Sequence, residues 1–132
     1  MVVELTEEHR KLLEERQLAN FVTLMKNGAP QVTPVWVDHD GTHILINTAE
    51  GRQKALNLHR DPRVALTVVD KNNDRRWLQV RGRVVEMTVG EPAEQHINKL
   101  AHKYNGRDYS YRAGEQRVLL RIAPDHITYR GS

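Results

Sequence analysis

The fold is decided by residues 21–47, which read FVTLMKNGAPQVTPVWVDHDGTHILIN. Three runs rich in apolar and β-branched residues, 21–25, 31–37 and 43–47, are typical of strands. They are separated by Asn27-Gly28 and Asp40-Gly41, dipeptides that favour tight hairpin turns. Because strands joined by such short turns pair antiparallel, we expect a three-stranded meander here.

The rest of the chain continues this pattern with few helical interruptions. We expect helices at 6–17, 51–60 and 92–104, strands at 63–69, 76–87, 118–122 and 126–129, and an exposed loop at 108–115. The strands do not alternate with helices, and no Gly-rich dinucleotide motif follows a strand, which argues against a parallel doubly wound sheet. The prediction is a mainly β fold, a six- to seven-stranded antiparallel barrel with helices.

Composition is that of a globular protein of one domain. The chain has 132 residues, of which 39% are hydrophobic and 28% charged, and it contains no cysteine. We find no signal peptide and no apolar run of about 20 residues, and therefore expect a cytoplasmic protein without membrane contact. The net charge of +3 is scattered, with no Lys/Arg tract, which favours a small anionic ligand over nucleic acid.

An anion site is predicted where the strand ending at Asn47 leads into the helix at 51–60. Arg52 and Lys54 lie at this helix start, where unpaired N–H groups and the helix dipole already attract negative charge. A phosphate group suits this arrangement. The alternative is a solvated helix start whose cations point into water.

The strand at 76–87 has two dissimilar faces. Period-two alternation places Trp77, Gln79, Arg81 and Arg83 on one face. The other face is apolar and belongs to the core, with Leu78, Val80, Gly82 and Val84. A Trp beside an amide and two guanidiniums indicates a face that covers a ligand or another subunit. The alternative is an amphipathic strand with a half-buried Trp.

The strand at 31–37 contains a proline, which removes a ladder donor and belongs at an edge or a bulge. Pro34 and Trp36 share one face of this strand. The backbone groups beside Pro34 are then free to face a ligand. The alternative is an irregular edge strand without a binding role.

No set of side chains suggests acid–base or nucleophilic catalysis. The only serines, Ser110 and Ser132, are not in a strand–turn–helix elbow, and the seven histidines lack metal-ligand spacing. We therefore predict no metal and no catalytic side chain. An enzyme of this kind leaves the difficult chemistry to a bound cofactor.

Five segments together resemble a known family: GAPQVTPVW at 28–36, NTAEGRQKALNL at 47–58, DPRVAL at 61–66, LQVRGRV at 78–84 and RVLLRIAP at 117–124. Their order and spacing are similar to those of the flavin and deazaflavin oxidoreductases with a pyridoxamine 5'-phosphate oxidase-like split β-barrel. The resemblance covers about residues 18–128. It implies a single FMN-binding split-barrel-like domain over residues 1–132 and a homodimer that holds each cofactor between two subunits.

The resemblance also implies a set of cofactor-binding residues. Arg52 and Lys54 would bind the cofactor phosphate, the backbone at 33–36 would line the ring system, and Gln79 with Trp77 would contact the ring or its linker. The full predicted set is Gln31, Thr33, Pro34, Val35, Trp36, Asn47, Thr48, Arg52, Lys54, Asn57, Trp77 and Gln79.

The short form of the chain, which ends without a substrate-binding extension, resembles the branch that uses the deazaflavin coenzyme F420. We expect an oxidoreductase that transfers hydride from reduced F420 to a conjugated small molecule. Cations at Lys26, Arg60, Arg75 and Arg76 are candidates to attract the glutamate tail of F420. The alternatives are an FMN-dependent reductase of the same fold and a non-catalytic F420- or flavin-binding carrier.

Overall fold

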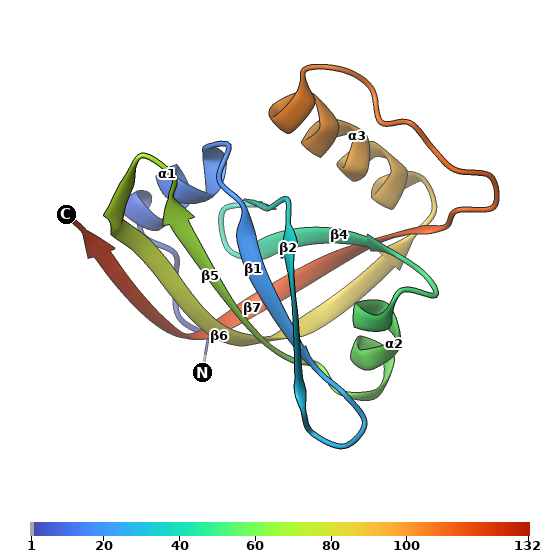
Figure 1. The fold of residues 1–132 in the computed structure, drawn as a ribbon, viewed down its shortest axis with the longest axis horizontal. Coiled ribbons are helices and arrows are strands. Elements are labelled where there is room, and N and C mark those ends of the chain that lie inside the picture. The colour runs from blue at the N-terminus through green and yellow to red at the C-terminus, as the bar shows by residue number, and fades with distance from the viewer. Residues whose placement is uncertain (1) are drawn as a thin grey trace.

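The computed structural model describes residues 2–132 as one seven-stranded antiparallel sheet with three helices (Figure 1). The strands follow the order β2-β1-β5-β6-β7-β4-β3 across the sheet. The elements are α1 (Glu7–Glu14), β1 (Ala19–Leu24), β2 (Pro30–Val35), β3 (Asp38–His39), β4 (Ile44–Ala49), α2 (Gln53–Arg60), β5 (Arg63–Asp70), β6 (Asn73–Val89), α3 (Glu91–Asn105) and β7 (Arg117–Gly131).

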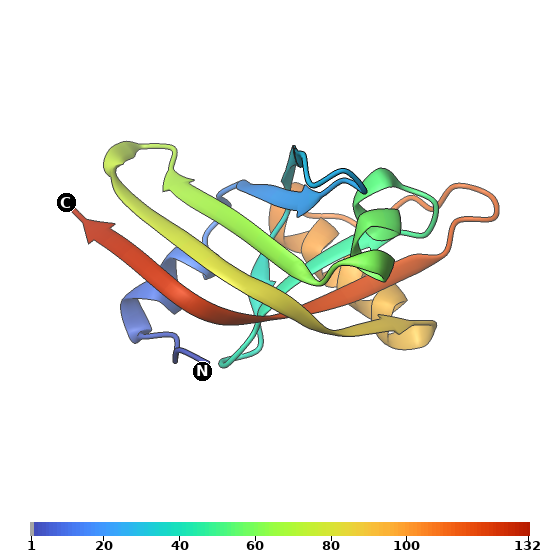
Figure 2. The same ribbon diagram turned by 90° about the horizontal axis from the view of Figure 1, so that it is seen from below.

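The long strands β6 and β7 curve across the molecule and give the sheet its half-barrel shape (Figures 1 and 2). A bulge in β7 assists the bend, because Arg81 pairs with His126 whereas Gly82 pairs with Pro124, which leaves Asp125 as the extra residue. A Cβ atom at Gly82 would lie 2.3 Å from the carbonyl oxygen of Ala123. Glycine is therefore required where the two strands approach.

The core lies inside the curled sheet and is closed by helices. Leu12 and Leu13 of α1 are fully buried, α2 packs on β1 and β4, and α3 packs on β7, β6 and β4. The largest fully buried sheet residues are Phe21, Ile44, Ile46, Leu66, Val68, Leu78, Leu120 and Ile122. No helix within residues 2–132 has the length and apolar character needed to span a membrane.

The predicted hairpin at Asn27-Gly28 is confirmed, and so is the edge position of the strand that contains Pro34. The predicted meander is wrong in its third strand. The segment at 43–47 becomes β4, which pairs with β7 and β3 instead of β2. All six residues of β4 are buried, and the strand therefore needs a position inside the sheet, which β2 at the edge does not offer.

Three predicted boundaries also change. The separate strands at 118–122 and 126–129 are one continuous strand, β7, because Pro124 is accommodated at the bulge. The seventh strand is instead the two-residue β3, which is too short to show periodicity. The first helix ends at Glu14 and not near residue 17, since Glu15 is already extended.

Candidate functional site

A pocket of about 340 Å³ lies between the end of β2, the start of α2, and α3. It brings together half of the predicted residues, namely Pro34, Val35, Trp36, Asn47, Arg52 and Lys54. The other lining residues are Leu18, Ile97, Leu100, Tyr109 and Arg117. The pocket thus combines cations with apolar and aromatic walls, a composition suited to a planar ligand with an anionic group.

Three cations line the pocket, and one of them lacks a partner. Lys54 is only 9% exposed, and within residues 2–132 its ammonium has neither a hydrogen bond nor an ion pair. Burial, followed by repulsion from Arg52 and Arg117, lowers the pKa of Lys54 below its usual value. Because a buried charge is costly unless it is paired, this site favours the arrival of an anion.

Glu115 partly neutralises these cations. Its carboxylate lies 2.9 Å from Arg117 Nη1, 2.9 Å from the Tyr109 hydroxyl and 3.7 Å from Arg52 Nη2. Burial alone would raise the pKa of Glu115, but hydrogen bonds from Tyr109 and Arg117 outweigh it and lower the pKa. One carboxylate among three cations leaves an excess of positive charge. The segment at 108–115, expected to be an exposed loop, contributes Tyr109 to the pocket wall and places Glu115 beside Arg52 and Arg117.

Arg117 was not predicted as a site residue, but the structure places it in the pocket wall at 4% exposure. Its Nε donates to Asn47 Oδ1 at 2.9 Å, and Asn47 Nδ2 donates to the carbonyl oxygen of Ala93 at 3.0 Å. The sequence does contain one indication of its role, because an arginine at the start of an apolar strand needs buried partners for its charge. The partner Asn47 is 70 residues away, however, so the sequence alone does not identify it.

Trp36 is held in place by an aromatic stack. Its ring lies parallel to that of Tyr104, with centroids 5.2 Å apart and an interplanar angle of 7°. The Tyr104 hydroxyl donates to the carbonyl oxygen of Gln17 and accepts from Val37 N–H at 3.2 Å. Tyr104 is thus fixed at both its ring and its hydroxyl, and it presents Trp36 to the pocket.

The remaining predicted residues of β2, β4 and α2 do not line the pocket. Thr33 Oγ1 and Thr48 Oγ1 are buried without a hydrogen-bond partner within residues 2–132. Asn57 is fully buried and donates to Thr23 Oγ1 at 2.9 Å, and Thr23 donates to Gln31 Oε1 at 3.2 Å. This polar chain joins α2 to β1 and β2.

Trp77 and Gln79 lie on the outer surface of β6, as the alternation predicted, while Leu78 and Val80 are fully buried. Gln79 lines a separate pocket of about 380 Å³ that also includes Asn20, Val22, Val32, Ala65, Leu66, Thr67 and Arg81. Trp77 is half-buried opposite Val69. Within one subunit, neither residue lines the pocket that contains Lys54.

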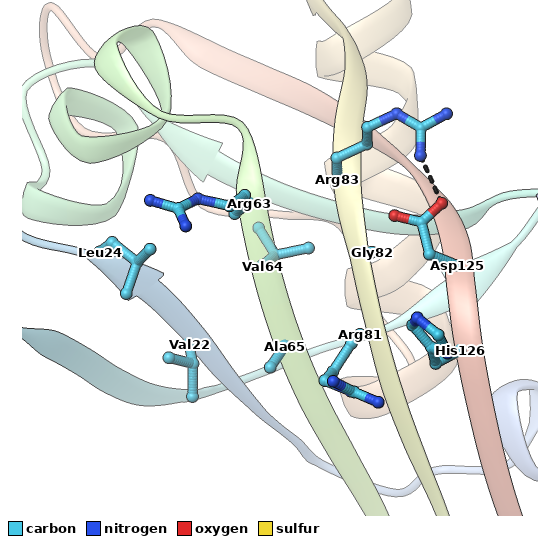
Figure 3. A pocket seen from close by; sticks show the side chains of 10 residues that line it. All are labelled: Val22, Leu24, Arg63, Val64, Ala65, Arg81, Gly82, Arg83, Asp125 and His126. Carbon is cyan, nitrogen blue, oxygen red and sulfur yellow. Dashed lines mark hydrogen bonds and ion pairs between the residues drawn. The ribbon is translucent and has the colours of Figure 1, made fainter. Parts of the chain in front are cut away.

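A second outer concavity, of about 690 Å³, follows Gln79 along the same face (Figure 3). Arg83 forms an ion pair with Asp125 there, and Arg63 pairs with Asp61 at 2.8 Å. Arg81 has no such partner within residues 2–132. Two of the three arginines that line this concavity are thus already paired with carboxylates, so the surface carries little free positive charge.

Two of the cations considered for an anionic tail are also committed to other contacts. Arg76 forms ion pairs with Glu15 at 2.7 Å and Asp70 at 3.0 Å, and Arg60 donates to the carbonyl oxygen of Leu24 at 2.5 Å. Lys26 and Arg75 remain exposed.

Most of the seven histidines pair with carboxylates: His39 with Glu14, His43 with Asp40, His59 with Glu50, His96 with Asp38 and His102 with Asp108. Across residues 2–132, no group of three or more acidic or histidine side chains is arranged to hold a metal ion.

Known proteins resemble this chain over nearly its whole length. The F420H(2)-dependent biliverdin reductase of Mycobacterium tuberculosis (strain CDC 1551 / Oshkosh) is 28% identical over 125 residues, covering 93% of this chain and 86% of the relative. A solved structure named F420 reductase is 28% identical with a TM-score of 0.82, covering 94% of this chain and 98% of that one. A conserved hypothetical protein of M. tuberculosis shares the fold, with a TM-score of 0.78 and 23% identity, over 98% of this chain and 86% of its own.

The family comparison covers nearly the whole chain. The model described as pyridoxamine 5'-phosphate oxidase matches residues 5–131. The chain therefore belongs to the pyridoxamine 5'-phosphate oxidase family.

Proposed function

We propose that the protein is an F420-dependent oxidoreductase that reduces a conjugated small molecule. The observation that carries this proposal is the buried, unpartnered Lys54 between Arg52 and Arg117, in a pocket walled by Trp36 and Tyr109. Two relatives at 28% identity are named as F420-linked reductases, which favours the deazaflavin over FMN. FMN remains the alternative cofactor because the pocket offers phosphate binding in either case.

Each part of the pocket has a proposed task. Arg52, Lys54 and Arg117 bind the cofactor phosphate through charge-assisted hydrogen bonds. Trp36 and the backbone of β2 orient the ring, and the apolar side chains of α3 exclude water. A reduced deazaflavin supplies hydride when bound, so the chain itself needs no nucleophile or metal.

We further propose a homodimer in which the outer face of one subunit completes the pocket of the other. Gln79 and Lys54 line different surfaces of one subunit, so that both reach one cofactor only if two subunits combine. The outer face offers exposed apolar side chains for this contact, including Val32 at 59% and Val69 at 40% exposure.

Titration with F420 and with FMN tests the cofactor. Quenching of tryptophan fluorescence by F420, with weaker or no binding of FMN, is the expected result, since Trp36 lies in the pocket wall. Nanomolar binding of FMN with no response to F420 would overturn the choice of cofactor. Biliverdin, which the relative's name specifies, and a panel of enones and quinones then test turnover. Tight binding of F420 without any turnover would favour the carrier alternative.

Subunit complementation tests the shared site. A Lys54→Met chain and a Gln79→Ala chain each bind cofactor weakly alone. A mixed dimer places the intact Lys54 pocket of one chain against the intact Gln79 of the other, and one of its two sites therefore regains normal affinity. If both residues served a site within one subunit, every site in the mixed dimer would keep one defect. Light scattering that shows a monomer would also refute the shared site.

A further inference from the structure

Four polar side chains form a hydrogen-bonded row that begins in the wall of the anion pocket and includes two residues without a role so far. The row runs from Arg117 through Asn47 and His96 to Asp38, whose exposed fractions are 4%, 8%, 7% and 6%. They come from β7, β4, α3 and β3 in turn. Buried polar groups of this kind are costly unless each is satisfied, so the row defines a specific arrangement.

The orientation of the Asn47 amide follows from its neighbours. Arg117 Nε can only donate, and it lies 2.9 Å from Asn47 Oδ1. The carbonyl oxygen of Ala93 can only accept, and it lies 3.0 Å from Asn47 Nδ2. Turning the amide over would place donor against donor and acceptor against acceptor, and its orientation is therefore fixed.

The fixed amide determines the protonation of His96. Its Nδ1 lies 3.1 Å from Asn47 Nδ2 and must accept a hydrogen bond, so the neutral ring carries its proton on Nε2. That Nε2–H donates to Asp38 Oδ1 at 3.0 Å. The other carboxylate oxygen, Oδ2, has no hydrogen bond within residues 2–132 and lies 3.9 Å from Lys99 Nζ.

We propose that His96 and Asp38 are positioning residues, which hold the Asn47 amide and through it the guanidinium of Arg117 at the anion pocket. This inference rests on the proposed function, in which that pocket binds the cofactor phosphate. Within residues 2–132, His96 forms no hydrogen bond with the pocket cations Arg52, Lys54 and Arg117. It acts on Arg117 only through Asn47.

The tautomer is testable without any ligand. Nitrogen-15 NMR of the ring of His96 in the full chain should show Nδ1 unprotonated and Nε2 protonated at neutral pH. Asn47 should give a side-chain amide signal shifted by its two acceptors. A ring protonated on Nδ1 at neutral pH would overturn the inference, whatever the cofactor.

Sulfate titration at pH 8 tests the link to the pocket, with Arg117 Nε–H and the Asn47 amide as the NMR reporters. His96→Asn places an amide oxygen near the position of Nδ1 and so retains an acceptor toward Asn47, and it should keep affinity within about threefold of wild type. His96→Gln carries its amide near the position of Nε2 and leaves no acceptor beside Asn47, so it should bind roughly tenfold more weakly.

The controls separate the possible failures. His102→Asn removes an exposed histidine that is paired with Asp108 and should change nothing. Thermal unfolding verifies that each variant is folded. Normal sulfate binding that is insensitive to both His96 variants refutes the positioning role alone. A wild-type protein that binds no sulfate, FMN or F420 refutes the proposed function and the positioning role together.

Discussion

Replacing Lys54 by Met should change anion affinity and stability in opposite directions. Methionine keeps the length and the apolar stem of the side chain and removes only its charge. In the folded protein the Lys54 residue as a whole is 9% exposed, and within residues 2–132 its charge is repelled by Arg52 and Arg117 and has no carboxylate partner of its own. Burial and these neighbours lower the pKa of Lys54, which means that the fold disfavours the charged form.

The two effects differ in size. Loss of one charge-assisted hydrogen bond costs about 1.5–3 kcal/mol of binding free energy, which weakens cofactor binding roughly 10- to 150-fold. Removal of an unpaired buried charge from a binding site should raise the free energy of unfolding of the ligand-free protein by about 0.5–2 kcal/mol. If Lys54 merely packed against the start of α2, its replacement would instead lower the free energy of unfolding of the protein.

Urea unfolding of the ligand-free protein and titration with F420 measure the two quantities. Lys11→Met is the matched control, since Lys11 has a 56% exposed side chain on α1 and should change both by less than about 0.5 kcal/mol. Unchanged affinity in a folded Lys54→Met protein would refute the anion site. If Lys54→Met instead lowered the free energy of unfolding as much as an ordinary core substitution does, the argument that the unpaired charge of Lys54 destabilises the ligand-free protein would be refuted.

Three further predictions concern the frame of the site. Gly82→Ala should lower the free energy of unfolding by about 1–3 kcal/mol in urea, because the new Cβ meets the carbonyl oxygen of Ala123 at 2.3 Å; unchanged stability would contradict the required close approach. Trp36→Ala should weaken F420 binding and, since it uncovers Tyr104, lower the melting temperature, whereas Trp36→Phe should retain most of both. Burial lowers the pKa of Lys103 to about 8, so the unfolded chain binds more protons above that pH and stability should rise from about pH 8 to 10.5. Lys103→Met should reduce that rise in urea unfolding, and an identical pH profile would refute this assignment.

Local patterns in the sequence predicted the features that depend on neighbouring residues. The alternation along β6 separated its outer face from the core, and Pro34 marked the edge strand, because both signals extend over only a few residues. The pair Arg52 and Lys54 was recognisable for the same reason, since a strand that leads into a helix defines a local geometry.

Long-range pairing explains what the sequence did not reveal. Arg117 reaches the pocket because β7 pairs with β4, which brings it to Asn47, 70 residues away. His96 is separated from Asn47 by 49 residues. The strand β7 continues through Pro124 because Gly82 of β6 allows the two strands to approach. No local pattern at residues 123–125 predicts this continuity.

The complete burial of β4 divides the pocket wall into a part that tolerates few substitutions and a part that tolerates more. Asn47 belongs to a strand in which every substitution disturbs the core, whereas residues 106–116 are mostly exposed and contain glycines in the left-handed region, Gly106 at φ 72° and Gly114 at φ 75°. A library confined to this loop would vary the pocket wall around Tyr109 while the scaffold stays folded. We therefore expect substitutions at the exposed positions of this loop to leave both the fold and the pocket cations in place, provided that Tyr109 and Glu115, which contact Arg117, are kept.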